Sequence, residues 1–499
     1  MKNLIKIISC LTSLVIINSC SDFLSMTPRD VKVISTIEDY RDIMGGFVMQ
    51  MKDTQKRKYV NMLGVSSSTH PYFGTSLIMS LYSNEIILDK GNTTYFDSNA
   101  GEFTTAGLQL QTWENTSETA KIWLQNYGFI GPINLVIDGI TRAKGTDEEL
   151  RNYVKGEALV WRAYTFYKLL QYFSPYKNNE LGIPIHLESV ENIGTAMPSR
   201  KTQAESFAQI LKDCNNALSL LEKTPTNQWN FWYREDFIYA MMASVYTWKA
   251  GSGAAENSDW QNAYDYAKKA QGIKVLTNDP AILKKAFNMS EKGVEEAFIN
   301  YDEITTRIVE FNDYSFFKNF GAVYNNDGSY NPFADKSAMI IMANQYDDTD
   351  IRKGFYFKND GTSLTKYQAV GKRGGTIIPF RLAEMVLIQA EAKSRMGEDA
   401  QALQILNDFR AARYTTPPTE PTNILEAILE ERELEFFCEL DFRWLDMKRQ
   451  GIEIERTISG KIYNLKSDDF RYTFPVPAAE MEANSNMIQA PGWENILVN

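Results

Sequence analysis

The sequence predicts a mostly α-helical fold, an irregular tetratricopeptide-like helical-repeat core with long, aromatic-rich loop excursions and a little β-structure. Two observations support this prediction. Apolar residues recur at spacings of three and four over several long segments, which is the period of a helix face. Pairs of such segments are joined by turns that contain glycine, as in tetratricopeptide units, although no fixed repeat length holds. We therefore expect an irregular repeat rather than a regular solenoid.

The first residues resemble a bacterial lipoprotein signal. Lys2 and Lys6 flank the start of an apolar run that is too short to span a bilayer, which takes ~20 residues. A small residue stands before Cys20, as it does where a signal is cut before a cysteine. We predict a signal peptide over 1–19, acylation of Cys20 and a tether over 20–37. An ordinary cleaved signal with a chance cysteine is the alternative.

The remaining residues, 38–499, are predicted to form one domain. The segment from Val154 to Phe173 is apolar on nearly all sides, which is typical of a helix in the core. Gly182-Ile183-Pro184 then reads as a crossing loop, and a second helix is expected over Ala204–Leu221. Two helix pairs are expected after it, over residues 235–249 and 260–271 and over residues 381–396 and 399–413.

Two stretches break the helical pattern, residues 70–115 and 300–378. Both are rich in Gly, Asn, Asp, Thr and aromatic residues. Loops held on a rigid scaffold often carry binding residues, and an exposed ring can stack on the apolar face of a pyranose. The residues predicted to contact ligand are Tyr95, Phe96, Trp113, Tyr314, Phe317, Tyr324 and Tyr330.

Charge and composition exclude several classes of function. The net charge of −11 argues against nucleic acid, whose phosphates need a basic surface. The histidines, His70 and His186, have no cysteine or histidine at ligand spacing, so no zinc site and no cofactor are expected. Cys214 and Cys438 are interpreted as buried thiols rather than as a disulfide.

Two groups of carboxylates could suggest other chemistry. Asp347-Asp348-x-Asp350 offers oxygen ligands for calcium, but it lacks the glycine and glutamate of an EF-hand loop and is interpreted as a solvated turn.

Glu431 and Glu435 could be the paired carboxylates of a glycosidase. However, Arg432, Arg443 and Asp446 are expected on the same helix, where pairs three or four residues apart form ion pairs. We therefore predict a binding protein and not an enzyme.

Motifs spaced along nearly the whole chain carry a resemblance. They are Cys20-Ser21-Asp22-Phe23-Leu24, Trp123-x-x-x-Tyr127, Gly156-Glu157-Ala158-x-x-x-Arg162-Ala163-Tyr164, Asp350-Ile351-Arg352, Glu431-Arg432-x-x-Glu435, Arg443-Trp444 and Phe474-Pro475-Val476-Pro477. In this order they resemble the SusD/RagB family of outer-membrane nutrient-binding lipoproteins from Bacteroidota. Where that family usually has Glu-Gly before the Arg-Trp pair, this chain has Glu439-Leu440-Asp441-Phe442, which predicts a local helix irregularity such as a π-bulge.

The resemblance implies a lipid-anchored protein on the outer membrane, exposed at the cell surface. By analogy with the family, it would capture an oligosaccharide and deliver it to a TonB-dependent SusC-like transporter, without a cofactor or a metal. A helical-repeat surface lipoprotein that binds a protein or peptide, without glycan affinity, remains the alternative.

Overall fold

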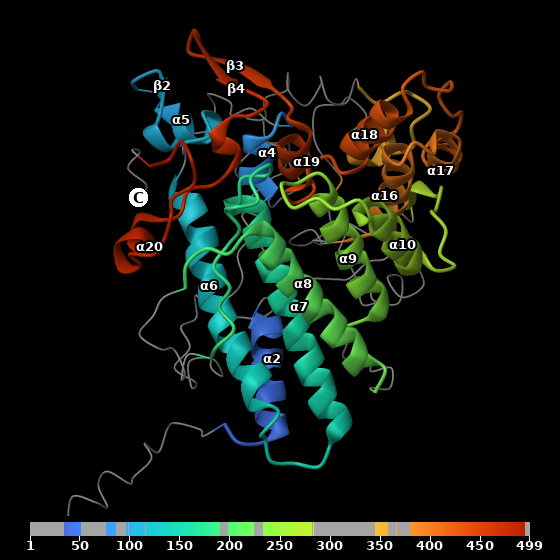
Figure 1. Ribbon diagram of the computed structural model, residues 1–499. Coiled ribbons are helices and arrows are strands. Elements are labelled where there is room, and N and C mark those ends of the chain that lie inside the picture. The colour runs from blue at the N-terminus through green and yellow to red at the C-terminus, as the bar shows by residue number, and fades with distance from the viewer. Residues whose placement is uncertain are drawn as a thin grey trace, which may run out of the picture.

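Figure 1 shows the computed structural model as a set of long helices capped at one end by a small β-hairpin and short helices. The structure describes residues 34–50, 76–85, 96–97, 99–114, 116–189, 198–223, 233–281, 283, 345–357, 366 and 380–494. Cys20 lies outside these residues, so the predicted signal, acylation site and most of the tether are not part of the description.

Helices make up most of the described chain, as the sequence predicts. Their bounds are α2 (Ile37–Gln50), α4 (Ser76–Tyr82), α5 (Thr105–Gln111), α6 (Thr116–Gly139), α7 (Glu148–Phe173), α8 (Gln203–Leu221), α9 (Glu235–Ala250), α10 (Asp259–Gln271), α15 (Lys353–Tyr356), α16 (Leu382–Arg395), α17 (Asp399–Ala411), α18 (Ile424–Glu435), α19 (Phe442–Gln450) and α20 (Ala478–Ala483), with a 3-10 turn η2 (Phe470–Tyr472).

Within the described residues, the β-structure consists of two antiparallel strand pairs. Strand β1 (Phe96–Asp97) pairs with β2 (Glu102–Phe103), and β3 (Ile454–Ile458) pairs with β4 (Lys461–Leu465). Both pairs lie at the same end of the molecule, near α4 and α5 (Figure 1). The fold class is therefore confirmed.

Five of the six expected helices begin and end within two residues of the predicted bounds. The sixth, α7, starts earlier, at Glu148, because Asp147 caps it by accepting a hydrogen bond from Leu150 N. Helix α8 opens with a capping box, in which the side chains and backbone amides of Thr202 and Glu205 bond reciprocally. Gly397 ends the α16 region with φ +79°, where glycine meets no steric penalty.

The helices pack as antiparallel neighbours in series. Helix α7 packs against α6 and α8, α8 against α9, α9 against α10, and α10 against α16, which in turn contacts α17 and α18. The segment just before α9 lies very close to α7 at Gly156, where a Cβ would lie 2.1 Å from the ring of Tyr233. This serial packing of helix pairs matches the predicted irregular repeat.

The crossing loop is also confirmed. Residues 181–189 carry no helix or named strand and are held against α6 and α8. The Asn134 side chain of α6 donates to the backbone carbonyls of His186 and Glu188, at 3.0 and 3.1 Å. Tyr127, about two turns earlier on α6, donates to Pro184 O at 3.0 Å.

Two expectations were wrong. The first excursion is not free of helices, since α4 and α5 lie within residues 70–115. The predicted π-bulge is instead a complete break between α18 and α19. Cys438 (φ 54°) and Leu440 (φ 49°) adopt left-handed backbone conformations that end one helix before the next begins. Cys438 thus lies in a turn.

Both cysteines of the described chain, Cys214 and Cys438, are buried free thiols, as predicted. Among the helices that the structure describes, none combines the length and the apolar character needed to cross a membrane.

Candidate functional site

The last turn of α18 and the turn before α19, residues 434–441, form a point at which distant parts of the chain meet. We call these residues the junction. The first excursion is fixed here by Glu85, which follows α4 and is buried. Its Oε1 accepts a hydrogen bond from Cys438 N at 2.7 Å. The break between α18 and α19 leaves this backbone amide without a helical partner, and Glu85, 353 residues away in sequence, supplies the acceptor.

The second excursion is fixed at the same junction by three buried side chains. Each donates to a carbonyl at the carboxyl end of α18, where helices leave carbonyls without intrahelical partners. The bonds are Tyr346 Oη to Leu434 O (2.7 Å), Tyr356 Oη to Glu435 O (2.7 Å) and Lys366 Nζ to Phe437 O (3.0 Å). The described ends of both excursions are therefore anchored within one short segment.

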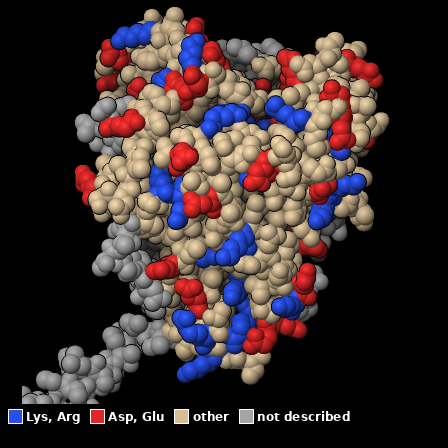
Figure 2. All heavy atoms as spheres, viewed as in Figure 1, with Lys and Arg blue, Asp and Glu red and all other residues tan. Residues whose placement is uncertain are grey.

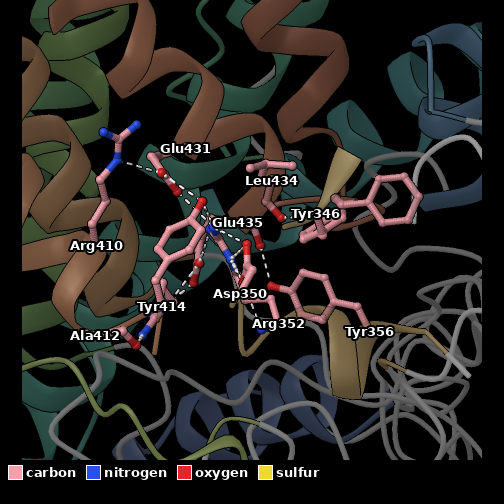
Figure 3. A network of polar contacts seen from close by, with 12 residues as sticks. Tyr346, Asp350, Arg352, Tyr356, Arg410, Ala412, Tyr414, Glu431, Leu434 and Glu435 are labelled. Atoms are coloured by element: carbon pink, nitrogen blue, oxygen red, sulfur yellow. Dashed lines mark hydrogen bonds and ion pairs between the residues drawn. The ribbon is translucent and has the colours of Figure 1, made fainter. Parts of the chain in front are cut away.

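A buried ion-pair network supports the junction (Figure 3). Glu435 accepts from Arg352 Nη1 at 3.1 Å and from Arg413 Nε at 2.9 Å, and it also pairs with Arg381. Burial by itself would raise the pKa of Glu435, but Arg413, Arg381 and Arg352 together hold this pKa well below its usual value. Glu435 is therefore a charged anchor for three separate segments.

Glu431, one turn earlier, is engaged in the same way (Figure 3). Its oxygens accept from Arg352 Nη2 and Arg410 Nε, both at 2.8 Å, and from Tyr414 Oη at 3.0 Å. Carboxylates occupied in this way have no free position for proton transfer to a substrate. The arrangement supports the structural role predicted for this pair.

The partners differ from those expected. The strongest contacts of Glu431 and Glu435 come from Arg352, Arg381, Arg410 and Arg413, not from their own helix.

Arg432, Arg443 and Asp446 were wrongly placed on one helix. Arg432 is on α18 and the other two are on α19, and the Arg432 Nε–Asp446 Oδ2 bond of 2.6 Å joins the two helices.

The aspartate cluster is only partly a solvated turn. Asp347 and Asp348 are exposed, with Asp347 accepting from Thr349 N at 2.7 Å. Asp350 is instead 3% exposed, and its carboxylate forms an ion pair with Arg352, with Oδ2 2.7 Å from Nη2. Across the described residues, no group of three or more His, Cys, Asp or Glu side chains could hold a metal ion.

Beside the junction lies a groove of about 350 Å³. It is lined by Asn423, Leu425, Glu426, Leu429, Glu430, Glu433, Arg443, Gln450 and Ile452. Arg443 forms part of its wall and is held by Asn84 Oδ1 (2.7 Å) and Glu433 Oε1 (2.8 Å). Because Asn84 belongs to residues 70–115, the groove borders the first excursion.

Only two of the seven predicted ligand-binding residues, Phe96 and Trp113, lie within the described residues. Tyr95, Tyr314, Phe317, Tyr324 and Tyr330 lie outside the described residues. Phe96 forms β1 and pairs with Phe103.

Trp113 is not the exposed ring that its loop position suggested. It is 3% exposed, and its Nε1 donates to Tyr82 O at 2.7 Å. The guanidinium groups of Arg456 and Arg471 lie 4.6 and 5.3 Å from the ring centroid. Its ring is therefore a core element beneath the β3–β4 hairpin.

Four residues that fix the junction were not singled out in the sequence: Glu85, Tyr346, Tyr356 and Lys366. They follow no helical period, and their partners are distant in sequence. Asp350-x-Arg352 was the signal that could have led to them, because this motif lies next to Tyr346 and Tyr356.

Figure 2 shows acidic and basic side chains mixed over the visible face, without a continuous basic surface. This pattern agrees with the acidic net charge and offers no broad footprint for phosphates on that face.

Comparison with known proteins links this architecture to a family. Residues 66–247 match the family model SusD-like_3, described as starch-binding associating with outer membrane. SusD-like protein P2 of Formosa agariphila is 23% identical over 486 residues, covering 87% of this chain and 91% of that protein. SusD-like protein P38 of the same organism is 34% identical over 103 residues, a match that covers 18% of this chain and 20% of that protein.

Solved structures share the fold. A SusD superfamily protein from Bacteroides thetaiotaomicron superposes with a TM-score of 0.65 at 22% identity, covering 91% of this chain and all of that chain. A SusD-like carbohydrate binding protein from Bacteroides vulgatus gives a TM-score of 0.59 at 20% identity, covering 91% and 97% of the two chains. The chain is therefore similar in sequence to SusD-like proteins, matches the SusD-like family model over residues 66–247, and shares the fold of solved SusD superfamily structures over 91% of its length.

Proposed function

We propose that this protein is a glycan-binding lipoprotein of the outer membrane, anchored through acylated Cys20. It captures an oligosaccharide at the cell surface and delivers it to a TonB-dependent SusC-like transporter. The observation that carries the proposal is the match to a family described as starch-binding and associated with the outer membrane. The fold shared with the carbohydrate binding protein of B. vulgatus supports a glycan as the ligand class.

The ligand surface proposed here is the groove beside the junction together with the two excursions. Pockets for small ligands measure ~300–1,000 Å³, a range that includes this groove. Leu425, Leu429 and Ile452 supply apolar contact, while amide and carboxylate groups of the lining can bind hydroxyls. Tyr95, Phe96, Tyr314, Phe317, Tyr324 and Tyr330 are proposed to add stacking contacts from the excursions.

The charges of the groove bear on which glycans it accepts. Glu426, Glu430 and Glu433 outnumber Arg443, the one cation among the lining residues. Carboxylate or sulfate groups on a sugar would therefore meet like charge, and such repulsion selects against anionic ligands. Neutral or amine-bearing sugars are the expected ligands.

Binding is tested with the chain lacking residues 1–19 and carrying Cys20→Ser, since the described fold begins at residue 34. Affinity electrophoresis and calorimetry against neutral, amino, uronic and sulfated glycans should show binding to the first two classes. A Glu430→Ala variant should lose selectivity against anionic glycans, and the distant exposed Glu149→Ala variant should not. Absence of binding to every glycan, with capture of a peptide ligand instead, would favour the helical-repeat alternative.

The anchor and the transporter are tested separately in cells. Radiolabelled palmitate should enter the wild-type protein and not a Cys20→Ala variant. Detergent extracts should contain the protein in a complex with an outer-membrane barrel. Labelling that persists without Cys20 would refute the anchor, and a protein that always purifies alone would refute delivery to a transporter.

A further inference from the structure

A small polar cavity of about 30 Å³ lies inside the protein, between α7, α9, α16 and the junction. Its lining includes Lys168 and Gln171 of α7, Thr247 of α9, Glu384 of α16 and Asp441 of the junction. It is distinct from the groove proposed for glycan and has no part in the ligand surface.

Two oxygens of this lining have no hydrogen-bond partner among the described residues, Glu384 Oε2 and Gln171 Oε1. The two side chains belong to residues that are 2% and 4% exposed. The other oxygen of Glu384 accepts from Arg432 Nη2 at 3.3 Å. A buried acceptor without a donor costs ~1–3 kcal/mol, so two such atoms beside one cavity point to a missing donor.

The cavity is large enough to hold one water molecule, which could be that donor. A buried water requires ~10–15 Å³ of accessible volume and two to four polar partners. The cavity exceeds this volume and is too small for a sugar or a larger solute. Lys168 supplies a third partner, because its ammonium carries three N–H donors and two of them go to the Asp441 oxygens, at 3.0 and 2.9 Å.

The charges around the cavity argue against a metal cation. Lys168, Arg432 and Arg449 line it, and they are balanced by Asp441, Asp446 and Glu384. Arg432 and Arg449 both pair with Asp446, at 2.6 and 2.8 Å. A cation would face three positive side chains at close range, whereas a neutral molecule with two donors meets the unsatisfied oxygens without added charge.

We infer that one water molecule is bound in this cavity, donating to Glu384 Oε2 and Gln171 Oε1 and accepting from Lys168. It bridges Lys168 and Gln171 of α7 to Glu384 of α16. By completing the hydrogen bonds of Glu384, it holds this side chain in place opposite Arg432, so that the contact between α16 and α18 is maintained.

The test is a crystal structure of the Cys20→Ser mature chain at a resolution that orders internal solvent. A single density peak is expected at ordinary hydrogen-bond distances, ~2.7–3.2 Å, from both oxygens. An empty cavity would overturn the inference. A peak with five or more oxygen neighbours at ~2.4 Å and anomalous scattering would also overturn it, because that geometry belongs to a cation.

A matched pair of variants adds a second measurement. Glu384→Gln keeps an acceptor at the cavity and should retain the peak, whereas Glu384→Met removes the acceptor and fills the space, so the peak should disappear. Retention of the peak in Glu384→Met would mean that Glu384 does not hold the water. The wild-type structure tests the inference even if the methionine variant fails to fold.

Discussion

Replacing Glu435 with alanine should be among the most damaging single changes outside any ligand surface. The substitution removes the carboxylate that Arg413, Arg352 and Arg381 share. Arg352 keeps Asp350 and Glu431 as partners, and Arg381 keeps Glu439.

Arg413 loses the most. It is fully buried, and its Nε and Nη2 both donate to Glu435, at 2.9 and 3.0 Å. Removing one member of a buried pair costs ~3–5 kcal/mol, because the remaining charge loses the partner that offsets its burial. The expected loss in the free energy of unfolding of Glu435→Ala is therefore about 3–5 kcal/mol.

Scanning calorimetry gives the readout. An unfolding entropy of ~2.1 cal/mol/K per residue makes each kcal/mol worth roughly 1 °C in Tm for a chain of this length, so Tm should fall by about 3–5 °C. Glu426→Ala, an exposed change on the same helix, is the control and should stay within ~0.5 kcal/mol of wild type. If Glu435→Ala and Glu426→Ala melt together, the network does not stabilise the junction as argued.

Three further predictions concern the helical core. In a urea titration, Gly156→Ala should destabilise the protein by at least about 2 kcal/mol through overpacking against Tyr233. This added cost should vanish in a Tyr233→Ala background. The control Gly354→Ala, whose Cβ would meet open space, should be neutral or slightly stabilising. Burial raises the pKa of Glu157 to about 7. Between pH 4.5 and 7 the folded state therefore holds a proton that the unfolded state has lost, and the free energy of unfolding falls as pH rises. Glu157→Gln should remove this contribution and stabilise the protein by about 3 kcal/mol at pH 8; an unchanged pH profile would refute the assignment. The two buried cysteine thiols should resist a thiol reagent in the native protein and react in denaturant, whereas a disulfide would leave them unreactive in both.

Much of the architecture could be predicted from sequence because its signals are local. Helical periodicity and capping residues act within a few positions, so five of the six expected helices were found within two residues at each end, and α7 was missed only in its first turns. The left-handed residues Cys438 and Leu440 carry no such signal, since neither is a glycine, and the break between α18 and α19 was missed for that reason.

The site was less predictable. Trp113 lies in the turn between α5 and α6, in a segment of loop-like composition, which suggested exposure. Its burial depends on Arg456 and Arg471, more than 300 residues away, which reach it only through the β3–β4 hairpin and the turn η2. Sequence pattern could not reveal this contact.

By itself, the sequence determined the helical class, the order of the helix pairs and, through ordered motifs, the resemblance to the SusD/RagB family. The tertiary structure alone decided which charges meet. Arg352 reaches Glu431 and Glu435 across 79 and 83 residues, and Glu85 reaches Cys438 across 353. Ion pairs and hydrogen bonds depend on distances of a few ångströms in space, and only packing of the helices brings such distant residues to one junction.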